Sequence, residues 1–296
     1  TADFGHFWKR RLMRLYPPYF AAVVASVAGL LVVFGSTSSD LAMRFGYSDL
    51  RALVADLALH VTMLQNLTDA SSRLRNAPLW TLALEEQLYL LYFPLLWLRR
   101  SFGWRTTLAV VSGVCLAWRA APLLLVDLPP LWTALGPARW LEWALGAVAV
   151  EAFVGRIALP KVAMSLSALV ATAIAAVLTT LAAPEPLRGI ASDPLFGIAF
   201  FVWLNTAVRS ERDGLVPGRL VSLLARVGVI SYSLYLVHVP LLSATRLLVV
   251  RAGLPESLGA ILMVGTLETG VALSGAWLFY RLIESRAKRW SRTAAV

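Results

Sequence analysis

The chain has 296 residues, 58% of them hydrophobic and only 15% charged, and its mean hydropathy is +0.70. Soluble domains are nearer half apolar and a quarter charged, so the composition excludes an ordinary soluble fold and indicates an integral membrane protein. The formal net charge is +10. In a membrane protein such an excess reports which loops face the cytoplasm, so we expect no nucleic-acid partner. The single cysteine, Cys115, excludes an internal disulfide and a thiolate metal cluster.

Apolar stretches long enough to cross a bilayer recur along the whole chain. A span needs roughly 17–25 residues to cover about 30 Å of hydrocarbon. We therefore predict an all-α, polytopic transmembrane helical bundle with about eight spans, in one integral-membrane domain covering 1–296. The expected spans are 17–34, 80–98, 105–125, 138–154, 161–182, 193–208, 228–249 and 258–280. A ninth stretch, 51–66, is short and carries Asp56 and His60, so we expect an interfacial or re-entrant helix there.

The distribution of lysine and arginine orients this bundle. With eight crossings, 18 of the 27 lysines and arginines fall in the connections on one side of the membrane and six on the other. Cytoplasmic loops carry the excess of these residues, so both ends of the chain are expected in the cytoplasm. If 51–66 also crossed the membrane, every later loop would change sides and the bias would be lost.

A basic turn precedes the first expected span, with Lys9, Arg10, Arg11 and Arg14 followed by Pro17-Pro18. One interpretation is ordinary positive charge beside anionic lipid. The other is a phosphate clamp, because arginines three apart share a helix face and guanidinium groups match phosphate oxygens. The two prolines are expected to interrupt the helix, restart the chain and fix the basic turn against the membrane surface.

Two adjacent carboxylates, Glu85 and Glu86, lie inside the second expected span. A carboxylate in a bilayer costs about 2.5–3.5 kcal/mol on insertion scales, so each needs a partner or a function. One interpretation pairs one of them with an intramembrane arginine, Arg119 or Arg139. The other is a buried acid beside a polar cavity, which orients a substrate or a histidine.

His238 is the third candidate and lies between Tyr235 and Pro240, which is expected to kink its helix. A membrane histidine is often only a satisfied polar group, so the structural interpretation stays open. His6 and His60 are weaker candidates. Three separated histidines without carboxylates at ligand spacing give no reason to expect a metal site.

Together these stretches resemble acyltransferase family 3, a family of multi-span bacterial membrane proteins. The family pattern Arg-Arg-x-x-Arg-x-x-Pro matches Arg10 to Pro17, and its Trp-Ser-Leu-x-x-Glu pattern matches Trp80 to Glu85, with Thr81 in place of Ser. The Ser-Tyr-x-x-Tyr-Leu-x-His-x-Pro pattern matches Ser231 to Pro240, and a closing Tyr-x-x-x-Glu matches Tyr280 to Glu284. The four matches occur in family order and extend over nearly the whole chain.

The resemblance implies transfer of an acyl group, often acetyl, from acyl-CoA to a hydroxyl of a carbohydrate, lipid-linked or other cell-envelope acceptor at the bacterial cytoplasmic membrane. Acyl-CoA would be a substrate, and no bound cofactor or metal is expected. Donor and acceptor contacts are expected at Arg10, Arg11, Arg14, Trp80, Tyr232 and Tyr235. Glu85 and His238 are expected to support catalysis.

The chain departs from the family at its start. The family has two earlier spans, the first with a basic residue followed some ten residues later by the histidine taken as the base, and neither His60 nor His238 occupies that motif. We therefore expect an N-terminally incomplete domain that is inactive alone. A non-enzymatic transporter or flippase for lipid-linked saccharide is the alternative, because intramembrane carboxylates and histidines also suit proton-coupled carriers.

Overall fold

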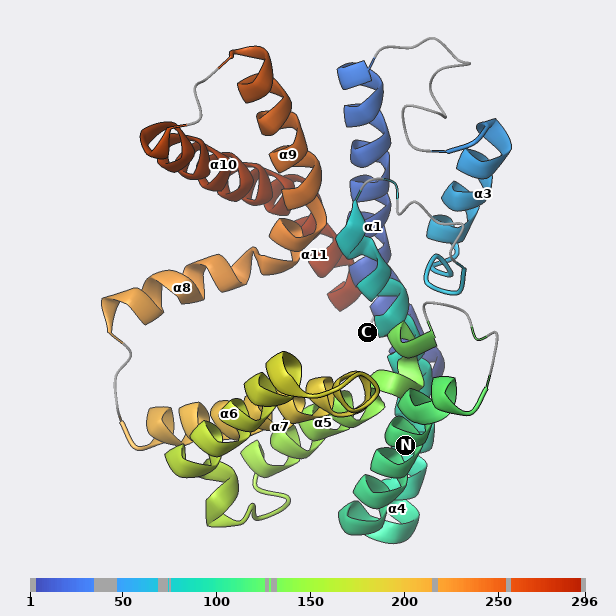
Figure 1. Cartoon of the computed structure of the whole chain (residues 1–296), viewed down its shortest axis with the longest axis vertical. Helices are drawn as coiled ribbons and strands as arrows, with labels where there is room; N and C mark the ends of the chain where they lie inside the picture. The colour runs from blue at the N-terminus through green and yellow to red at the C-terminus, as the bar shows by residue number, and fades with distance from the viewer. Residues whose placement is uncertain are drawn as a thin grey trace. The chain divides into compact units, whose positions relative to one another are not determined.

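A computed structural model describes residues 4–34, 47–68, 74, 76–125, 128, 132–214, 218–253 and 257–293. These residues form helices and no strand, which confirms the predicted all-α class (Figure 1). The helices are α1 (Phe4–Phe34), α3 (Leu50–Val61), α4 (Trp80–Ala120), α5 (Trp140–Phe153), α6 (Leu166–Ala182), α7 (Leu187–Arg212), α8 (Arg219–Val229), α9 (Ser231–Arg251), α10 (Leu258–Phe279) and α11 (Ser285–Thr293). A π-helical turn, Tyr280–Glu284, joins α10 to α11, and a short 3₁₀ turn, Ala77–Leu79, precedes α4.

Each of the eight expected spans falls largely on a helix of the described chain. Four helical stretches there are long and apolar enough to cross a membrane, and α6 is a shorter apolar helix. The four are Ala77–Leu123, Leu187–Arg212, Ser231–Arg251 and Leu258–Ser291. The number of crossings therefore stays a prediction. The expected short helix is confirmed as α3, whose 12 residues extend only about 18 Å.

The chain divides into two compact units. The first contains Thr1–Gln65, Ala70–Thr81 and Gly218–Val296, and the second contains Asn66–Asp69 and Leu82–Pro217. In the first unit, α1 packs against α9 and α11, and α10 packs against α9. In the second, α7 packs against α5 and α6.

The helix α1 runs through Pro17 and Pro18 without a break, so the predicted interruption is wrong. Proline lacks the N–H that would bind the carbonyl four residues earlier, which leaves the carbonyl oxygens of Met13 and Arg14 without their helical donors. The following residues nevertheless pack tightly, with Tyr19 completely buried and Ala22 almost so. The basic turn is therefore continuous with the apolar part of the same helix.

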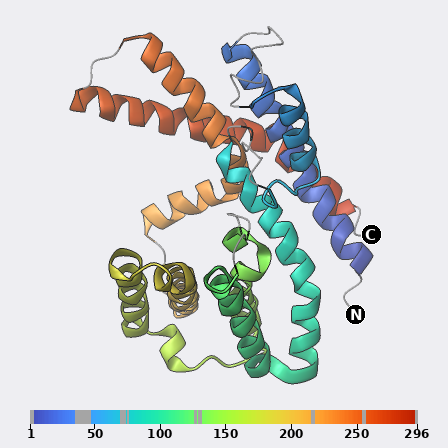
Figure 2. The ribbon, with the colours of Figure 1, turned by 45° about the vertical axis from the view of Figure 1, so that its right-hand side comes forward.

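A glycine divides α4 into the two helices expected from the sequence. Gly103 has φ 72° and ψ 173°, a backbone conformation that is essentially restricted to glycine. The chain turns back there, and Figure 2 shows the two halves of α4 running in opposite directions. The Thr107 hydroxyl donates to the Gly103 carbonyl oxygen at 2.8 Å and secures the start of the second half.

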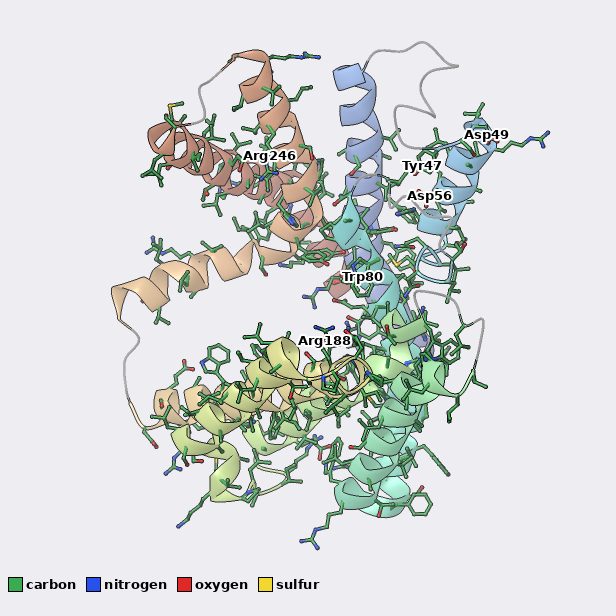
Figure 3. The ribbon with its side chains drawn as sticks, viewed as in Figure 1. Tyr47, Asp49, Asp56, Trp80, Arg188 and Arg246 are labelled. Carbon is green, nitrogen blue, oxygen red and sulfur yellow. The ribbon has the colours of Figure 1, made fainter. Side chains whose placement is uncertain are left out.

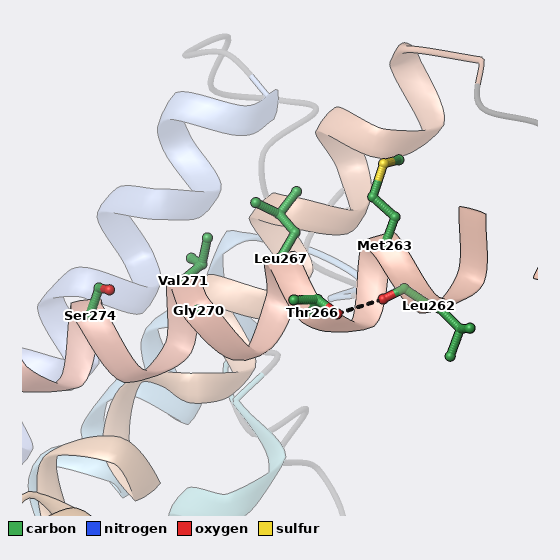
Figure 4. Close-up of a pocket in the computed structure, with 7 residues that line it drawn as sticks. All are labelled: Leu262, Met263, Thr266, Leu267, Gly270, Val271 and Ser274. Carbon is green, nitrogen blue, oxygen red and sulfur yellow. Dashed lines mark hydrogen bonds between the residues drawn. The ribbon is translucent and has the colours of Figure 1, made fainter. Parts of the chain in front are cut away.

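The two long helices of the C-terminal hairpin, α9 and α10, approach closely at one glycine. A Cβ added to Gly275 would lie 2.5 Å from the Leu241 side chain, so a larger residue at this crossing would require Leu241 to move. The helix α10 also carries an open groove of about 710 Å³ (Figure 4). It is lined mainly by exposed apolar side chains such as Leu262, Met263 and Leu267, as expected of a surface that meets hydrocarbon.

Candidate functional site

The first two turns of α9 contact the other three matched sequence patterns, all within the first unit. The contact with α1 is made by Tyr232, whose hydroxyl donates to the main-chain oxygen of Leu15 at 3.0 Å. Leu15 directly follows Arg14 in the basic turn. The start of α9 is therefore fixed beside the turn that carries the arginines.

The closing glutamate of the sequence caps α9. Glu284 is 1% exposed, and its Oε2 accepts a hydrogen bond from the Ser233 N–H at 3.1 Å and another from the Ser233 hydroxyl. The first N–H groups of a helix have no partner within it, so this carboxylate satisfies a donor that α9 cannot satisfy itself. Its Oε1 lies 2.6 Å from Lys288 Nζ, which compensates the buried charge.

The start of α4 meets α9 through two hydroxyl groups. The hydroxyl oxygens of Tyr235 and Thr81 lie 2.8 Å and 3.0 Å from the Pro78 carbonyl oxygen and also contact each other. Each hydroxyl has one proton, so one of them donates to the carbonyl oxygen while the other donates either to the same oxygen or to its neighbour. Trp80 lies between these anchor points at the first position of α4 and is half-buried (Figure 3). Thr81 thus supplies the hydroxyl that the family pattern takes from serine.

Asn76 donates a hydrogen bond to the carbonyl oxygen that Pro240 leaves without a donor in α9. Pro240 has no N–H, so the carbonyl oxygen of Leu236, four residues earlier, lacks its helical donor. Asn76 Nδ2 supplies a donor at 3.0 Å and also lies 3.1 Å from the Ser26 hydroxyl oxygen on α1. Asn76 is completely buried. The sequence predicted a kink at Pro240, but nothing in it identified Asn76.

The His238 ring is held in one tautomer. Its Nδ1 lies 3.0 Å from the Leu234 carbonyl oxygen and 2.9 Å from the Tyr235 carbonyl oxygen. Carbonyl oxygens only accept hydrogen bonds, so Nδ1 carries a proton, and in the neutral ring Nε2 presents a lone pair. The residue is half-buried, and its ring centroid is 6.0 Å from that of Tyr235. His238 can therefore accept a hydrogen bond from a ligand hydroxyl.

The basic turn presents its charges at the surface of the first unit. Lys9, Arg10 and Arg14 are exposed, and Arg11 is half-buried with its guanidinium 5.2 Å from the centre of the Phe7 ring. Stacking on an aromatic ring orients a guanidinium group. Geometry and charge are both suited to phosphate binding.

Glu85 and Glu86 belong to the second unit. Glu85 is exposed and accepts a hydrogen bond from the Tyr89 hydroxyl at 3.1 Å, and Glu86 is half-buried. The two arginines considered as partners for them bind other acids. Arg119 lies 3.0 Å from Asp193 and 3.4 Å from Glu142, and Arg139 lies 2.6 Å from Asp193. The structure thus assigns these arginines to an ion cluster within the second unit.

The remaining histidines have structural surroundings. His60 Nδ1 lies 3.0 Å from Asp56 Oδ1, and the Tyr47 hydroxyl binds the other oxygen of Asp56 (Figure 3). The Tyr19 hydroxyl donates to the His60 carbonyl oxygen at 2.8 Å and holds α3 against α1. His60 is completely buried, so it serves packing in this arrangement. His6 is exposed near the start of α1.

A model of a protein family described as an acyltransferase domain, acyltransferase family 3, matches residues 1–281. The chain belongs to this family. No curated protein and no solved structure gives a significant match. The acyltransferase match includes the first three patterns in full and reaches the beginning of the fourth. With its long apolar helices, the chain is a multi-pass membrane acyltransferase.

Proposed function

We propose that this acyltransferase moves an acyl group, acetyl in the simplest case, from acyl-CoA to a hydroxyl of a carbohydrate or lipid-linked acceptor of the cell envelope. The observation that carries the proposal is the contact of the other three patterns with the first turns of α9. One of these contacts joins α9 to the basic turn. The first unit therefore contains both the arginines that would bind a phosphate-bearing donor and a cluster of hydroxyl-bearing side chains.

The arginines of α1 would bind the phosphates of acyl-CoA. Arg10, Arg11 and Arg14 carry guanidinium groups, which form charge-assisted hydrogen bonds with phosphate oxygens. The positive-inside distribution supports a cytoplasmic position for this turn and for both ends of the chain, where acyl-CoA is available. We place the protein in the bacterial cytoplasmic membrane.

The acyl group would pass directly from the donor to the acceptor. A general base removes the proton of the acceptor hydroxyl, the oxygen attacks the thioester carbonyl carbon, and collapse of the tetrahedral oxyanion breaks the carbon–sulfur bond. The CoA thiolate then takes up the proton. We assign the base to no residue of this chain.

His238, Tyr232, Tyr235 and Glu85 would have supporting roles. The lone pair on His238 Nε2 would accept a hydrogen bond from the acceptor hydroxyl, and Tyr232 and Tyr235 would line the route between donor and acceptor. Trp80 would supply an aromatic surface to the donor or acceptor. Glu85 would orient the acceptor or the base. A water-excluding helical bundle would protect the thioester from hydrolysis.

Donor binding is the part of this proposal that can be tested with this chain alone. The purified full chain is titrated with acetyl-CoA, together with the variant carrying Arg11→Ala and Arg14→Ala. The matched control carries Arg246→Ala and Arg251→Ala, which removes equal charge from the opposite end of α9. We expect loss of at least about 100-fold in affinity for the first variant, since each lost charge-assisted hydrogen bond is worth about 1.5–3 kcal/mol. Unchanged binding, or equal loss in the control, would remove the donor role and favour a carrier for the acceptor.

A further inference from the structure

The second unit contains a cavity of about 350 Å³ between the C-terminal ends of α5 and α7. The segment 157–164, which links α5 to α6, closes one side of the cavity. Its volume lies at the lower end of the range for small-ligand sites, about 300–1,000 Å³. None of the residues expected to bind the donor or acceptor lines it. The cavity is therefore a separate feature of the protein.

The polar groups of this cavity suit an anion that also carries a hydroxyl. Arg209 and Arg212 lie on its exposed rim, and Asn205, only 7% exposed, lies on its buried side. Asn205 Nδ2 donates to the Phe201 carbonyl oxygen at 2.7 Å, which leaves Asn205 Oδ1 as an acceptor for a ligand hydroxyl.

Both arginines keep donors for a ligand. Arg209 lies 3.6 Å from Asp213, and both side chains are more than half exposed, so this ion pair is weak. Arg212 donates to the Phe153 carbonyl oxygen, and its guanidinium lies 4.7 Å from the centre of the Phe153 ring. The rim carries two guanidinium groups and one carboxylate, that of Asp213, so its net charge is positive.

The remaining lining is apolar and continuous with a surface suited to lipid. Met164, Val208 and Leu159 form the apolar walls, and Phe153 is 54% exposed at the rim. The cavity lies at the ends of two expected spans, on the side where the lysine and arginine excess predicts the cytoplasm. Basic pockets between membrane helices on that side are sites for anionic phospholipid head groups.

We propose that this cavity binds the head group of an anionic, hydroxyl-bearing phospholipid such as phosphatidylglycerol. The phosphate lies between Arg209 and Arg212, the head-group hydroxyls reach Asn205, and the acyl chains follow the apolar rim past Phe153. A soluble nucleotide fits this site less well, because the walls formed by Met164, Val208 and Leu159 are apolar. The lipid stabilises the association of α5, α7 and the segment between them.

Native mass spectrometry of the delipidated full chain in detergent tests this site. Phosphatidylglycerol is titrated against the wild type, the variant Arg209→Ala with Arg212→Ala, and a control with Arg100→Ala and Arg105→Ala. The control removes two exposed arginines from the same unit and the same expected side, outside the cavity. The rim variant should bind roughly tenfold more weakly, and the control should stay within about twofold of the wild type.

A second variant tests the cavity without changing charge. Ala158→Trp places a large ring in the space lined by Ala158, Met164 and Val208 and should abolish the bound lipid while preserving the arginines. Phosphatidylcholine with the same acyl chains should bind roughly tenfold more weakly than phosphatidylglycerol. Equal loss in the control variant, equal binding of phosphatidylcholine, unchanged binding by Ala158→Trp, or equal competition by glycerol 3-phosphate would each overturn the proposal.

Discussion

The start of α9 in the first unit and the Arg119 cluster in the second both bury polar atoms in an apolar protein, but they satisfy them differently. Around α9, side chains of one segment bind main-chain groups of another that a helix start, Pro240 or a turn leaves without a partner. Around Arg119, charged side chains bind one another and two main-chain oxygens, those of Ala138 and Gly189.

This difference indicates that the contacts around α9 mainly position side chains of the site, whereas the contacts of Arg119 mainly stabilise the fold of the second unit. The α9 contacts fix the backbone and leave His238 Nε2 available to a ligand. The Arg119 contacts use the guanidinium itself, whose side chain is only 1% exposed, and join α4, α5 and α7. We therefore expect changes at Arg119 to reduce stability most, and changes around α9 to have smaller effects on stability.

Replacing Arg119 with Leu should have the largest effect on stability. The change leaves Glu142 and two carbonyl oxygens without this donor and leaves Asp193 with Arg139 alone, and breaking a buried ion pair from one side costs about 3–5 kcal/mol. Denaturant unfolding in detergent measures the loss. The comparison variant Arg139→Gln affects a side chain that is 29% exposed and should cost about 1 kcal/mol or less. Equal losses in the two variants would contradict the assigned central role of Arg119.

Replacing Glu284 with Gln should cost about 2 kcal/mol, because a hydrogen bond to a charged group is worth about 1.5–3 kcal/mol. Glutamine keeps an oxygen for the Ser233 N–H but loses the ion pair with Lys288. Lys288→Met tests the same pair from the other side and should be less stable than the wild type, since it leaves the Glu284 charge buried. Wild-type unfolding of both variants would show that this cap does not hold α9.

The link between Asn76 and Pro240 can be tested by a double-mutant cycle. Asn76→Ala leaves the buried Leu236 carbonyl oxygen without a donor and should cost about 1–3 kcal/mol. Pro240→Ala restores the helical N–H to that oxygen, so the cost of Asn76→Ala should be smaller in the Pro240→Ala background. Additive losses would mean that Asn76 acts elsewhere, for example only through Ser26.

Tyr235→Phe should have the smallest effect on stability of these changes. It removes a donor from Pro78 O and a partner from Thr81, and single hydrogen bonds in membrane proteins average about 0.6 kcal/mol with a maximum near 1.7. Thr81→Ser keeps the hydroxyl and should unfold like the wild type to within about 0.5 kcal/mol. A larger loss for Thr81→Ser than for Tyr235→Phe would show that the methyl group of Thr81, rather than the hydroxyl pair, matters here.

Much of the fold followed from local sequence properties, whereas the partners in the site did not. Hydropathy located the helices, and the length of 51–66 predicted the short α3. The prediction that Pro17 and Pro18 interrupt α1 was wrong, because the helix passes through both residues without a break and packs tightly beyond them. Hydropathy gave no sign that α8 is separate from α9.

Long-range pairing explains the remaining differences. The sequence identified Arg119 as an intramembrane charge but suggested Glu85 or Glu86 as a partner, whereas Asp193 lies 74 residues away and fills that role. Asn76 reaches Leu236 across 160 residues, and no local pattern reports such a contact. The matched patterns predicted Tyr232, Tyr235 and Glu284 as important residues without indicating the main-chain groups that they bind.

The most direct test of donor binding by the α1 arginines compares acetyl-CoA with acetyl-pantetheine, which keeps the thioester but lacks the nucleotide and its phosphates. Affinities are measured for the wild type and for the variant with Arg11→Ala and Arg14→Ala. If these arginines bind the phosphates, the variant should lose at least about 100-fold for acetyl-CoA and almost nothing for acetyl-pantetheine. Equal losses for both ligands, or no loss for either, would contradict the account.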